Sequence, residues 1–193
     1  MNVQLTDKIE TIFKSTLQLI KENGFHGTPM SQIAKNSDVA IGTIYHYFPS
    51  KENLILELFK YSRKQLYQFI FDEIKEETPY KEQFYIVFKR FCAFHIEHND
   101  VSGFLEQFYN SPYNECIRQQ EISGSLEENK LMNLFMKGID EKHIKDINVQ
   151  ILSSAYIGAA VSYSKTVIYG KVQFEVKQLD DLIDIIWNGV KQH

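Results

Sequence analysis

Residues 28–51 of this 193-residue chain, TPMSQIAKNSDVAIGTIYHYFPSK, decide its fold. The threonine and proline that open the stretch predict the start of a short helix, because proline lacks only an N–H that the first helical turn leaves unbonded. Ser37–Ala40 are too few for more than a tight connection, in which Asp38 is the residue best able to adopt left-handed backbone. A second short helix follows and stops at Pro49. The motif, about 29–48, therefore has the spacing of a helix-turn-helix.

The second helix has the composition of a strand, since residues 44–48, IYHYF, are rich in β-forming types. A strand here would have no partner elsewhere in the chain, so we predict a helix. With Ile44 turned inward, steps of 100° per residue place Phe48 beside it and put Gly42 and His46 on the opposite face. Thr43 and Tyr45 flank that face. It offers the close approach, hydrogen-bond donors and methyl groups that suit the major groove of DNA.

An alternative interpretation places every aromatic residue of this helix in the core, with Tyr45 and Tyr47 packed against the first helix. Seven residues cannot bury Ile44, Phe48 and both tyrosines on one side, which favours the exposed face. Bulk charge does not point to nucleic acid, because the net charge is −4 and residues 1–60 carry equal numbers of acidic and basic side chains. Any DNA binding must therefore come from a local arrangement of contacts.

The rest of the chain predicts helices and no strand. Apolar residues recur at helical spacing from Ile9 to Ile20, with Asp7 as a cap and Gly24 as the stop. We therefore expect an all-α fold of about nine helices, in which a three-helix DNA-binding domain, 1–50, precedes a larger helical domain, 51–193. The expected later helices span 51–77 (a long connecting helix), 81–98, 101–111, 115–138, 142–169 and 175–190.

Several other classes of protein are disfavoured. With 44% hydrophobic residues the chain can bury a core, which excludes intrinsic disorder. The N-terminus lacks a secretory signal, so we expect a cytoplasmic protein, and two unpaired thiols at Cys92 and Cys116 are favoured over one disulfide. The uncharged stretch 147–164 is too polar for a membrane span and predicts a buried or interfacial helix instead.

The segment GFHGTPMSQIAKNSDVAIGTIYHYFPSKENLI resembles the DNA-binding segment of the TetR (TetR/AcrR) family of transcriptional regulators. The resemblance covers about 60 residues and includes Gly24-Phe25, Thr28, Ile33-Ala34, Val39, Gly42–Phe48 and Ser50–Glu52. It implies a homodimeric, ligand-responsive repressor, released from a near-palindromic operator by a small effector. It also implies DNA contacts by Thr28, Ile41, Gly42, Thr43, Tyr45, His46, Tyr47 and Lys51. Many family members have lysine or arginine at the position of Ile41. The resemblance therefore implies that this chain lacks one phosphate contact there, and that Ile41 is free to contact a thymine methyl group instead.

More than half of the aromatic residues lie between residues 59 and 113. A generous core is one explanation. The other is that so many large planar side chains leave irregular space, with polar groups among them to orient a ligand. By resemblance to the family, this is where a mostly apolar or aromatic effector would bind. The expected pocket residues are Phe69, Phe88, Phe91, His95, Phe104, Phe108 and Tyr109.

The last two helices are expected to form the dimer interface. Gly158 and Ala159 would let a partner helix approach closely, Tyr156 and Ser162 would add polar contacts, and Leu182 and Ile186 belong to an apolar stripe that also includes Leu179, Ile183 and Val190. Exposed in a monomer, such a surface would exceed what soluble proteins usually tolerate.

No catalytic motif, metal site or cofactor site is predicted. Cys92, His95 and His98 share one helix face, but a structural zinc site needs a fourth ligand, and none is assignable. A helical enzyme of the di-iron type would need Glu-x-x-His on two helices, and the chain contains none. A helical enzyme and a ligand-free helical adaptor are the alternatives to a DNA-binding regulator, and the groove-facing helix argues against both.

Overall fold

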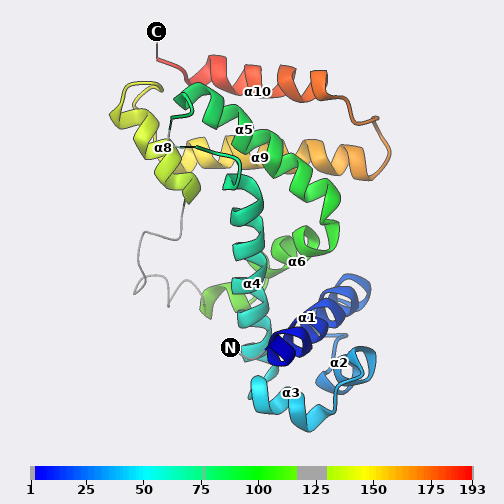
Figure 1. The fold of residues 1–193 in the computed structure, drawn as a ribbon. Helices are drawn as coiled ribbons and strands as arrows, with labels where there is room; N and C mark the ends of the chain where they lie inside the picture. The colour runs from blue at the N-terminus through cyan, green and yellow to red at the C-terminus, as the bar shows by residue number, and fades with distance from the viewer. Residues whose placement is uncertain (1–2, 76, 117–129, 193) are drawn as a thin grey trace. The chain divides into compact units, whose positions relative to one another are not determined.

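The computed structural model describes residues 3–75, 77–116 and 130–192, and within them the fold is all-α, as predicted. No strand occurs in these ranges, and the only β pairing there is an isolated bridge between Ile144 and Lys191. The helices are α1 (Val3–Asn23), α2 (Met30–Ser37), α3 (Ile41–Tyr47), α4 (Lys51–Phe71), α5 (Tyr80–Glu97), α6 (Asn99–Tyr109), α8 (Lys130–Asp140), α9 (Val149–Ile168) and α10 (Val176–Val190) (Figure 1).

The chain divides into two compact units. Unit 1 comprises Met1–Lys64 and Asn99–Gly124, and unit 2 comprises Gln65–His98 and Ser125–His193. Helix α4 contributes to both, since its first fourteen residues belong to unit 1 and the rest to unit 2. Because α6 joins unit 1, neither unit is continuous in sequence, and the expected domains 1–50 and 51–193 stay a prediction.

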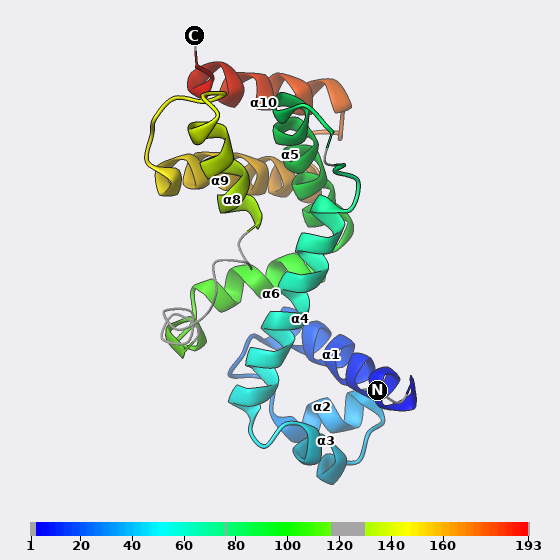
Figure 2. The ribbon, with the colours of Figure 1, turned by 60° about the vertical axis from the view of Figure 1, so that its left-hand side comes forward.

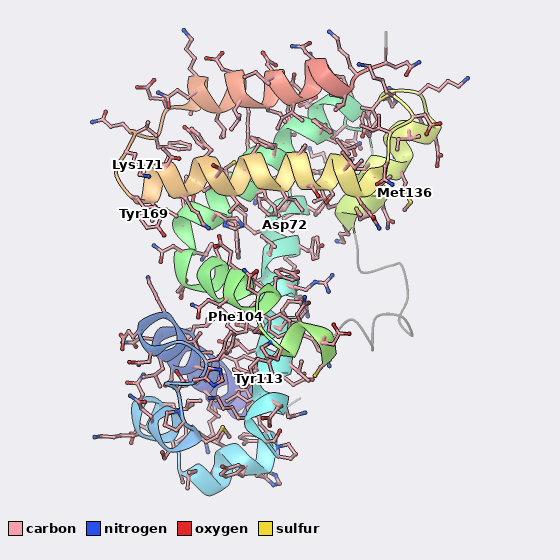
Figure 3. The ribbon with its side chains drawn as sticks, turned by 180° about the vertical axis from the view of Figure 1, so that it is seen from behind. Asp72, Phe104, Tyr113, Met136, Tyr169 and Lys171 are labelled. Carbon is pink, nitrogen blue, oxygen red and sulfur yellow. The ribbon has the colours of Figure 1, made fainter. Side chains whose placement is uncertain are left out.

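Unit 1 is built around α1, with α2 and α3 packed as a group beside it (Figure 2). Helix α6 also packs on α1, and the Phe25 ring lies 5.9 Å from that of Phe104 on α6 and 5.2 Å from that of Tyr113, which follows α6. Figure 3 labels Phe104 and Tyr113. The rings of Phe59 and Phe108 stack with centroids 4.0 Å apart and join α4 to α6. Burial of these aromatic rings stabilises the packing of α4 and α6 in the unit that contains the DNA-binding motif.

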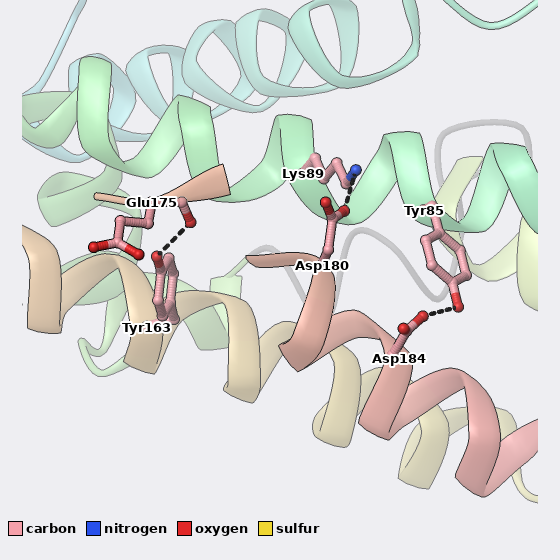
Figure 4. A network of polar contacts seen from close by, with 6 residues as sticks. All are labelled: Tyr85, Lys89, Tyr163, Glu175, Asp180 and Asp184. Atoms are coloured by element: carbon pink, nitrogen blue, oxygen red, sulfur yellow. Dashed lines mark hydrogen bonds and ion pairs between the residues drawn. The ribbon is translucent and has the colours of Figure 1, made fainter. Parts of the chain in front are cut away.

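Unit 2 is a helical bundle in which α5, α9 and α10 each contact the other two, with α8 against α9 (Figure 1). Tyr156 of α9 is fully buried at its centre, where its hydroxyl donates to the Phe84 carbonyl at 2.6 Å. The outer contact between α5 and α10 is polar: the Tyr85 hydroxyl donates to Asp184 at 2.6 Å, and Lys89 pairs with Asp180 (Figure 4).

Several predicted helix boundaries are corrected. Helix α1 begins at Val3, so Asp7 is not a cap and lies inside the helix. Helix α4 ends at Phe71 and not near Glu77, and α9 begins only at Val149, where the Asn148 side chain accepts hydrogen bonds from two backbone N–H groups. The expected helix 115–138 lies mostly outside the described residues. No described helix is both long and apolar enough to cross a membrane.

Candidate nucleic-acid interface

The turn between α2 and α3 has the geometry that the sequence predicts. Asp38 ends α2 in the left-handed region, with φ 52° and ψ 35°, and its backbone N–H donates to the Ala34 carbonyl. The next N–H, that of Val39, bonds the same carbonyl at 3.1 Å. These two bonds close the end of α2 and redirect the chain into α3 within three residues. The left-handed residue predicted for this turn is therefore confirmed.

Two side chains anchor α3 to the core of unit 1. Ile44 is 0% exposed and Phe48 is 4% exposed, and the Phe48 ring lies 5.6 Å from that of Phe13 on α1. The Phe48 N–H donates to the Ile44 carbonyl at 2.8 Å, which completes the last helical turn. Residues 41–47 are thus helical despite their β-forming composition, because burial of two side chains four apart outweighs intrinsic propensity.

The exposed surface of α3 carries no Asp, Glu, Lys or Arg side chain. Ile41 and Tyr45 are 44% and 46% exposed, Gly42 and His46 are also exposed, and Thr43 and Tyr47 are half-buried beside them. A Cβ added at Gly42 would meet no atom within 4 Å, so this part of the face is open. This surface is therefore apolar and bears hydroxyl groups, and Ile44 and Phe48 anchor the other side of the helix in the core.

Two residues expected to contact DNA, Thr28 and Lys51, make hydrogen bonds within their own chain. Thr28 is 0% exposed and its hydroxyl donates to the Gly24 carbonyl at 2.9 Å, so it is neither a helix cap nor a surface contact, and its predicted DNA contact is withdrawn. Lys51 is half-buried, and its ammonium donates to the Phe25 carbonyl. Burial lowers the pKa of Lys51, and the neighbouring Glu52 carboxylate opposes that shift.

The sequence prediction overlooked the exposed face of α2. Gln32, Lys35 and Asn36 project from this helix opposite the buried Ile33 and Ala34. In a helix-turn-helix the first helix crosses the phosphate backbone, so polar side chains on its free face are candidates for contacts with DNA. The same count of 100° per residue that located the face of α3 would have found them.

The residues expected to line an effector pocket are distributed over both units. Phe69, Phe88, Phe91 and His95 belong to unit 2, whereas Phe104, Phe108 and Tyr109 belong to unit 1. In unit 2, Phe88, Phe91 and His95 are buried and Phe69 is half-buried, and the rings of Phe91 and His95 stack 4.8 Å apart. In unit 1, Phe104 and Phe108 are core residues, and Tyr109 is 53% exposed.

The neighbouring Cys92, His95 and His98 face different surroundings. Cys92 is buried with its thiol 3.8 Å from the Ala160 carbonyl, and burial raises the pKa of this thiol to about 12. The His98 ring contacts Phe69 and Phe94. Within the described residues, no three His, Cys, Asp or Glu side chains are grouped so as to hold a metal ion.

The residues expected at the dimer interface on α9 and α10 range from exposed to fully buried. Gly158 and Ser162 are exposed, and Ala159, Leu182 and Ile186 are half-buried. Tyr156 is corrected, because it is fully buried within its own unit. The stripe on α10 also divides: Leu179 and Ile183 face the core of unit 2. The sequence prediction missed the exposed isoleucines Ile151 and Ile185, which are 69% and 71% exposed.

Comparison with protein families matches both parts of this chain. Residues 12–58 match the family described as bacterial regulatory proteins, tetR family. Residues 79–191, more than half of the chain, match the tetracyclin repressor-like C-terminal domain. The first match contains α2, the turn and α3, and the second contains most of unit 2.

Individual proteins resemble the chain over its whole length. The fatty acid metabolism regulator protein of Bacillus subtilis (strain 168) is 28% identical over 193 residues, which cover 97% of each chain. A TetR family transcription regulator from Marinobacter aquaeolei VT8 has the same fold, with TM-score 0.89, 18% identity and full coverage of both chains. The transcriptional regulator FadR from Bacillus subtilis, in complex with stearoyl-CoA, gives TM-score 0.72 and 23% identity over 93% of this chain and 98% of that one.

Proposed function

Since this chain belongs to the tetR family of bacterial regulatory proteins and is a ligand-responsive, DNA-binding transcriptional repressor, we propose that it acts as a homodimer with one α3 in each half of a near-palindromic operator. Two-fold symmetry of the protein is matched by two-fold symmetry of the DNA, with half-sites about one helical turn apart or a multiple of it. We place its action in the cytoplasm, with no enzymatic step in the cycle.

The observation that carries the DNA-binding part is the exposed face of α3. Ile44 and Phe48 fix the helix from behind, so that Ile41, Tyr45 and His46 can meet a groove without rearrangement. Thr43 and Tyr47 lie at the edges of this face, where hydroxyl groups donate to phosphates or bases. Lys35 and Gln32 on α2 contact the phosphate backbone of the DNA, which fixes the position of α3 in the groove.

An unbiased DNA selection followed by a binding titration tests this assignment. We expect the purified protein to enrich a palindromic sequence and to bind it less tightly as salt rises, because phosphate contacts release counterions. Tyr45→Ala should weaken binding to the enriched site while leaving the circular dichroism spectrum and the oligomeric state unchanged. Glu82→Ala, a change at an exposed position of unit 2, is the matched control and should bind as the wild type.

We assign the dimer contact to the exposed faces of α9 and α10. Ile151, Gly158 and Ser162 follow one another along the free side of α9, and Ile185 lies on the free side of α10. Large exposed apolar side chains beside small residues favour close packing against a second copy. Leu182 and Ile186, half-buried in one chain, would be covered fully by this contact.

We assign the effector to the class of long apolar acyl compounds. Support comes from the name of the Bacillus subtilis relative and from stearoyl-CoA in the FadR structure, and from the aromatic residues of unit 2. Of the four unit 2 residues expected to contact a ligand, Phe69 is held from its outer side by Arg90. The guanidinium lies 4.6 Å from the Phe69 ring centroid, and Nε donates to the Phe69 carbonyl at 2.5 Å.

Phe69 is the one of these four residues that is only half-buried, so it is the ring that an incoming ligand can reach first. Phe88, Phe91 and His95 are buried, and moving them would disrupt contacts with other core rings. Phe104 and Phe108 are accounted for by the core of unit 1, so we leave them and Tyr109 out of the site. An acyl chain would thus enter beside Phe69 and extend along α5.

Calorimetry with stearoyl-CoA, with and without the selected operator, tests the effector assignment. If the ligand releases the DNA, linkage requires the operator to weaken ligand binding by the factor by which the ligand weakens operator binding, typically 5–150-fold. Phe69→Ala should weaken ligand binding and leave operator binding without ligand unchanged. Stearoyl-CoA affinity that is the same with and without operator would exclude this class of effector as the releasing signal.

A further inference from the structure

The recognition helix α3 lacks every side-chain type that reads a base edge with paired hydrogen bonds. In the major groove, arginine and lysine recognise guanine, asparagine and glutamine recognise adenine, and aspartate and glutamate accept from cytosine. Residues 41–47, IGTIYHY, contain none of these. Sequence discrimination by α3 therefore rests on single hydrogen bonds or on apolar contacts with the base pairs, not on paired hydrogen bonds.

The base-pair group that the most exposed large side chains of α3 can contact is an apolar one. Ile41 and Tyr45 are four residues apart and so are neighbours on the helix surface, and both are nearly half exposed. The space above Gly42 is open, so nothing holds a base pair away from this pair of side chains. The only apolar group that a base pair presents in the major groove is the C5-methyl group of thymine.

We propose that Ile41, supported by Tyr45, selects thymine in each half-site by burying its C5-methyl group. The inference rests on the proposed function, because it requires α3 to lie in the major groove. Burying the methyl group against the exposed isoleucine removes apolar surface of both partners from water, which is favourable. The Thr43 hydroxyl can donate or accept and so does not discriminate among bases by itself. Ile41 is thus the residue that determines specificity at this position.

Deoxyuridine substitution in the selected operator tests the proposal, because uracil lacks only the C5-methyl group and keeps the hydrogen-bonding edge of thymine. Each thymine is replaced in turn, and dissociation constants are measured at fixed salt. One buried methyl group corresponds to about fourfold in affinity, and symmetric replacement in both half-sites to about 16-fold. We expect one thymine in each half-site to show this loss.

The side chain responsible is identified by a double-mutant cycle. With Ile41→Ala the thymine and uracil operators should bind equally, whereas Ile41→Val should keep part of the difference. Ile168→Ala removes an isoleucine of similar exposure, 39%, at the end of α9, and should keep the full difference. Replacing the thymine–adenine pair by cytosine–guanine should weaken binding, and 5-methylation of that cytosine should restore part of the loss because it returns the methyl group.

The outcomes separate this proposal from the function on which it rests. Failure of the selection to enrich any sequence would overturn the proposed DNA binding itself. An enriched operator in which no thymine is sensitive to uracil would overturn the methyl contact alone. A uracil penalty that persists unchanged in Ile41→Ala would likewise overturn the role of Ile41.

Discussion

Gly138 in the last turn of α8 cannot carry a side chain, because the buried ring of Tyr80 lies against it. A Cβ added at this position would overlap the Tyr80 Oη and Cζ atoms and lie 2.9 Å from Cε1. Tyr80 has little room to retreat. Its ring is 5% exposed, stacks on His143 with centroids 4.7 Å apart, and neighbours Phe84 and Trp187.

The cost of Gly138→Ala follows from this overlap. Alanine in a helix is normally favoured over glycine by up to about 1 kcal/mol. Here that gain is opposed by overpacking of a buried ring, which typically costs about 1–3 kcal/mol. We expect the free energy of unfolding to fall by about 1–2 kcal/mol. Gly103→Ala in α6 is the matched control, because its added Cβ meets no atom within 4 Å, and it should raise the free energy by about 0.5–1 kcal/mol.

Urea denaturation followed by circular dichroism measures both changes at one protein concentration, since stability of a dimer depends on concentration. The overlap is tested further in a Tyr80→Leu background, where Oη and Cζ are absent and Gly138→Ala should cost little or nothing. Equal stability of Gly138→Ala and Gly103→Ala, or an unchanged cost after Tyr80→Leu, would refute the packing of Tyr80 on α8.

Changes at five further positions have definite expected results. Lys51→Met should lower the free energy of unfolding without DNA by about 1 kcal/mol and leave the salt dependence of operator binding unchanged, whereas Lys35→Met should reduce that dependence. Ala159→Asp should give monomers in light scattering. Asp38→Ala should be about 1 kcal/mol less stable than Asp38→Gly in urea, because only glycine adopts φ 52° without strain. Burial raises the pKa of the Cys92 thiol from 9.0 to about 12. The stabilisation that depends on the protonated thiol is therefore complete below pH 9 and is lost as pH rises toward 12. Cys92→Ala should remove this loss when unfolding is measured as a function of pH.

The DNA-binding motif could be predicted from the sequence because its determinants are local. The turn at Asp38 and the stop at Pro49 are set by the backbone preferences of single residues. The faces of α3 follow from the positions of Ile44 and Phe48, which are four apart and both buried. The structure adds only which neighbours these side chains contact, and Phe13 is one of them.

The roles of Thr28 and Lys51 could not be predicted in the same way. A threonine before proline fits a helix cap by pattern, in which its oxygen would accept from a backbone N–H, but the Thr28 hydroxyl instead donates to the Gly24 carbonyl. Lys51 meets the Phe25 carbonyl, 26 residues earlier in the chain. The Lys51 contact depends on how the α1–α2 turn folds against the start of α4, which no local spacing specifies, and the Thr28 contact depends on the conformation of the turn itself.

The faces of α10 show the same limit on a larger scale. Its apolar residues occupy more than half of the helix circumference, so the sequence cannot tell which of them face the core. In the structure Leu179, Ile183 and Trp187 are buried and Ile185 is exposed. Asp180 and Asp184 lie against α5, where Lys89 pairs with Asp180 and the Tyr85 hydroxyl donates to Asp184 (Figure 4). Burial of the three apolar side chains selects the inward face, and the exposed polar pairs add little to it.

Aromatic abundance is ambiguous for a related physical reason. A ring that packs against other rings satisfies the same apolar preference whether or not a ligand lies beside it, so composition cannot separate a core from a pocket. Phe88 and Phe84 both contact Tyr156 and are fully buried by other side chains of the unit. A recognition face differs, because it must leave apolar groups exposed until the partner arrives. Ile41 is unfavourable in water and becomes favourable only in a complex, so its exposure is informative about function, whereas the burial of Phe88 is informative only about folding.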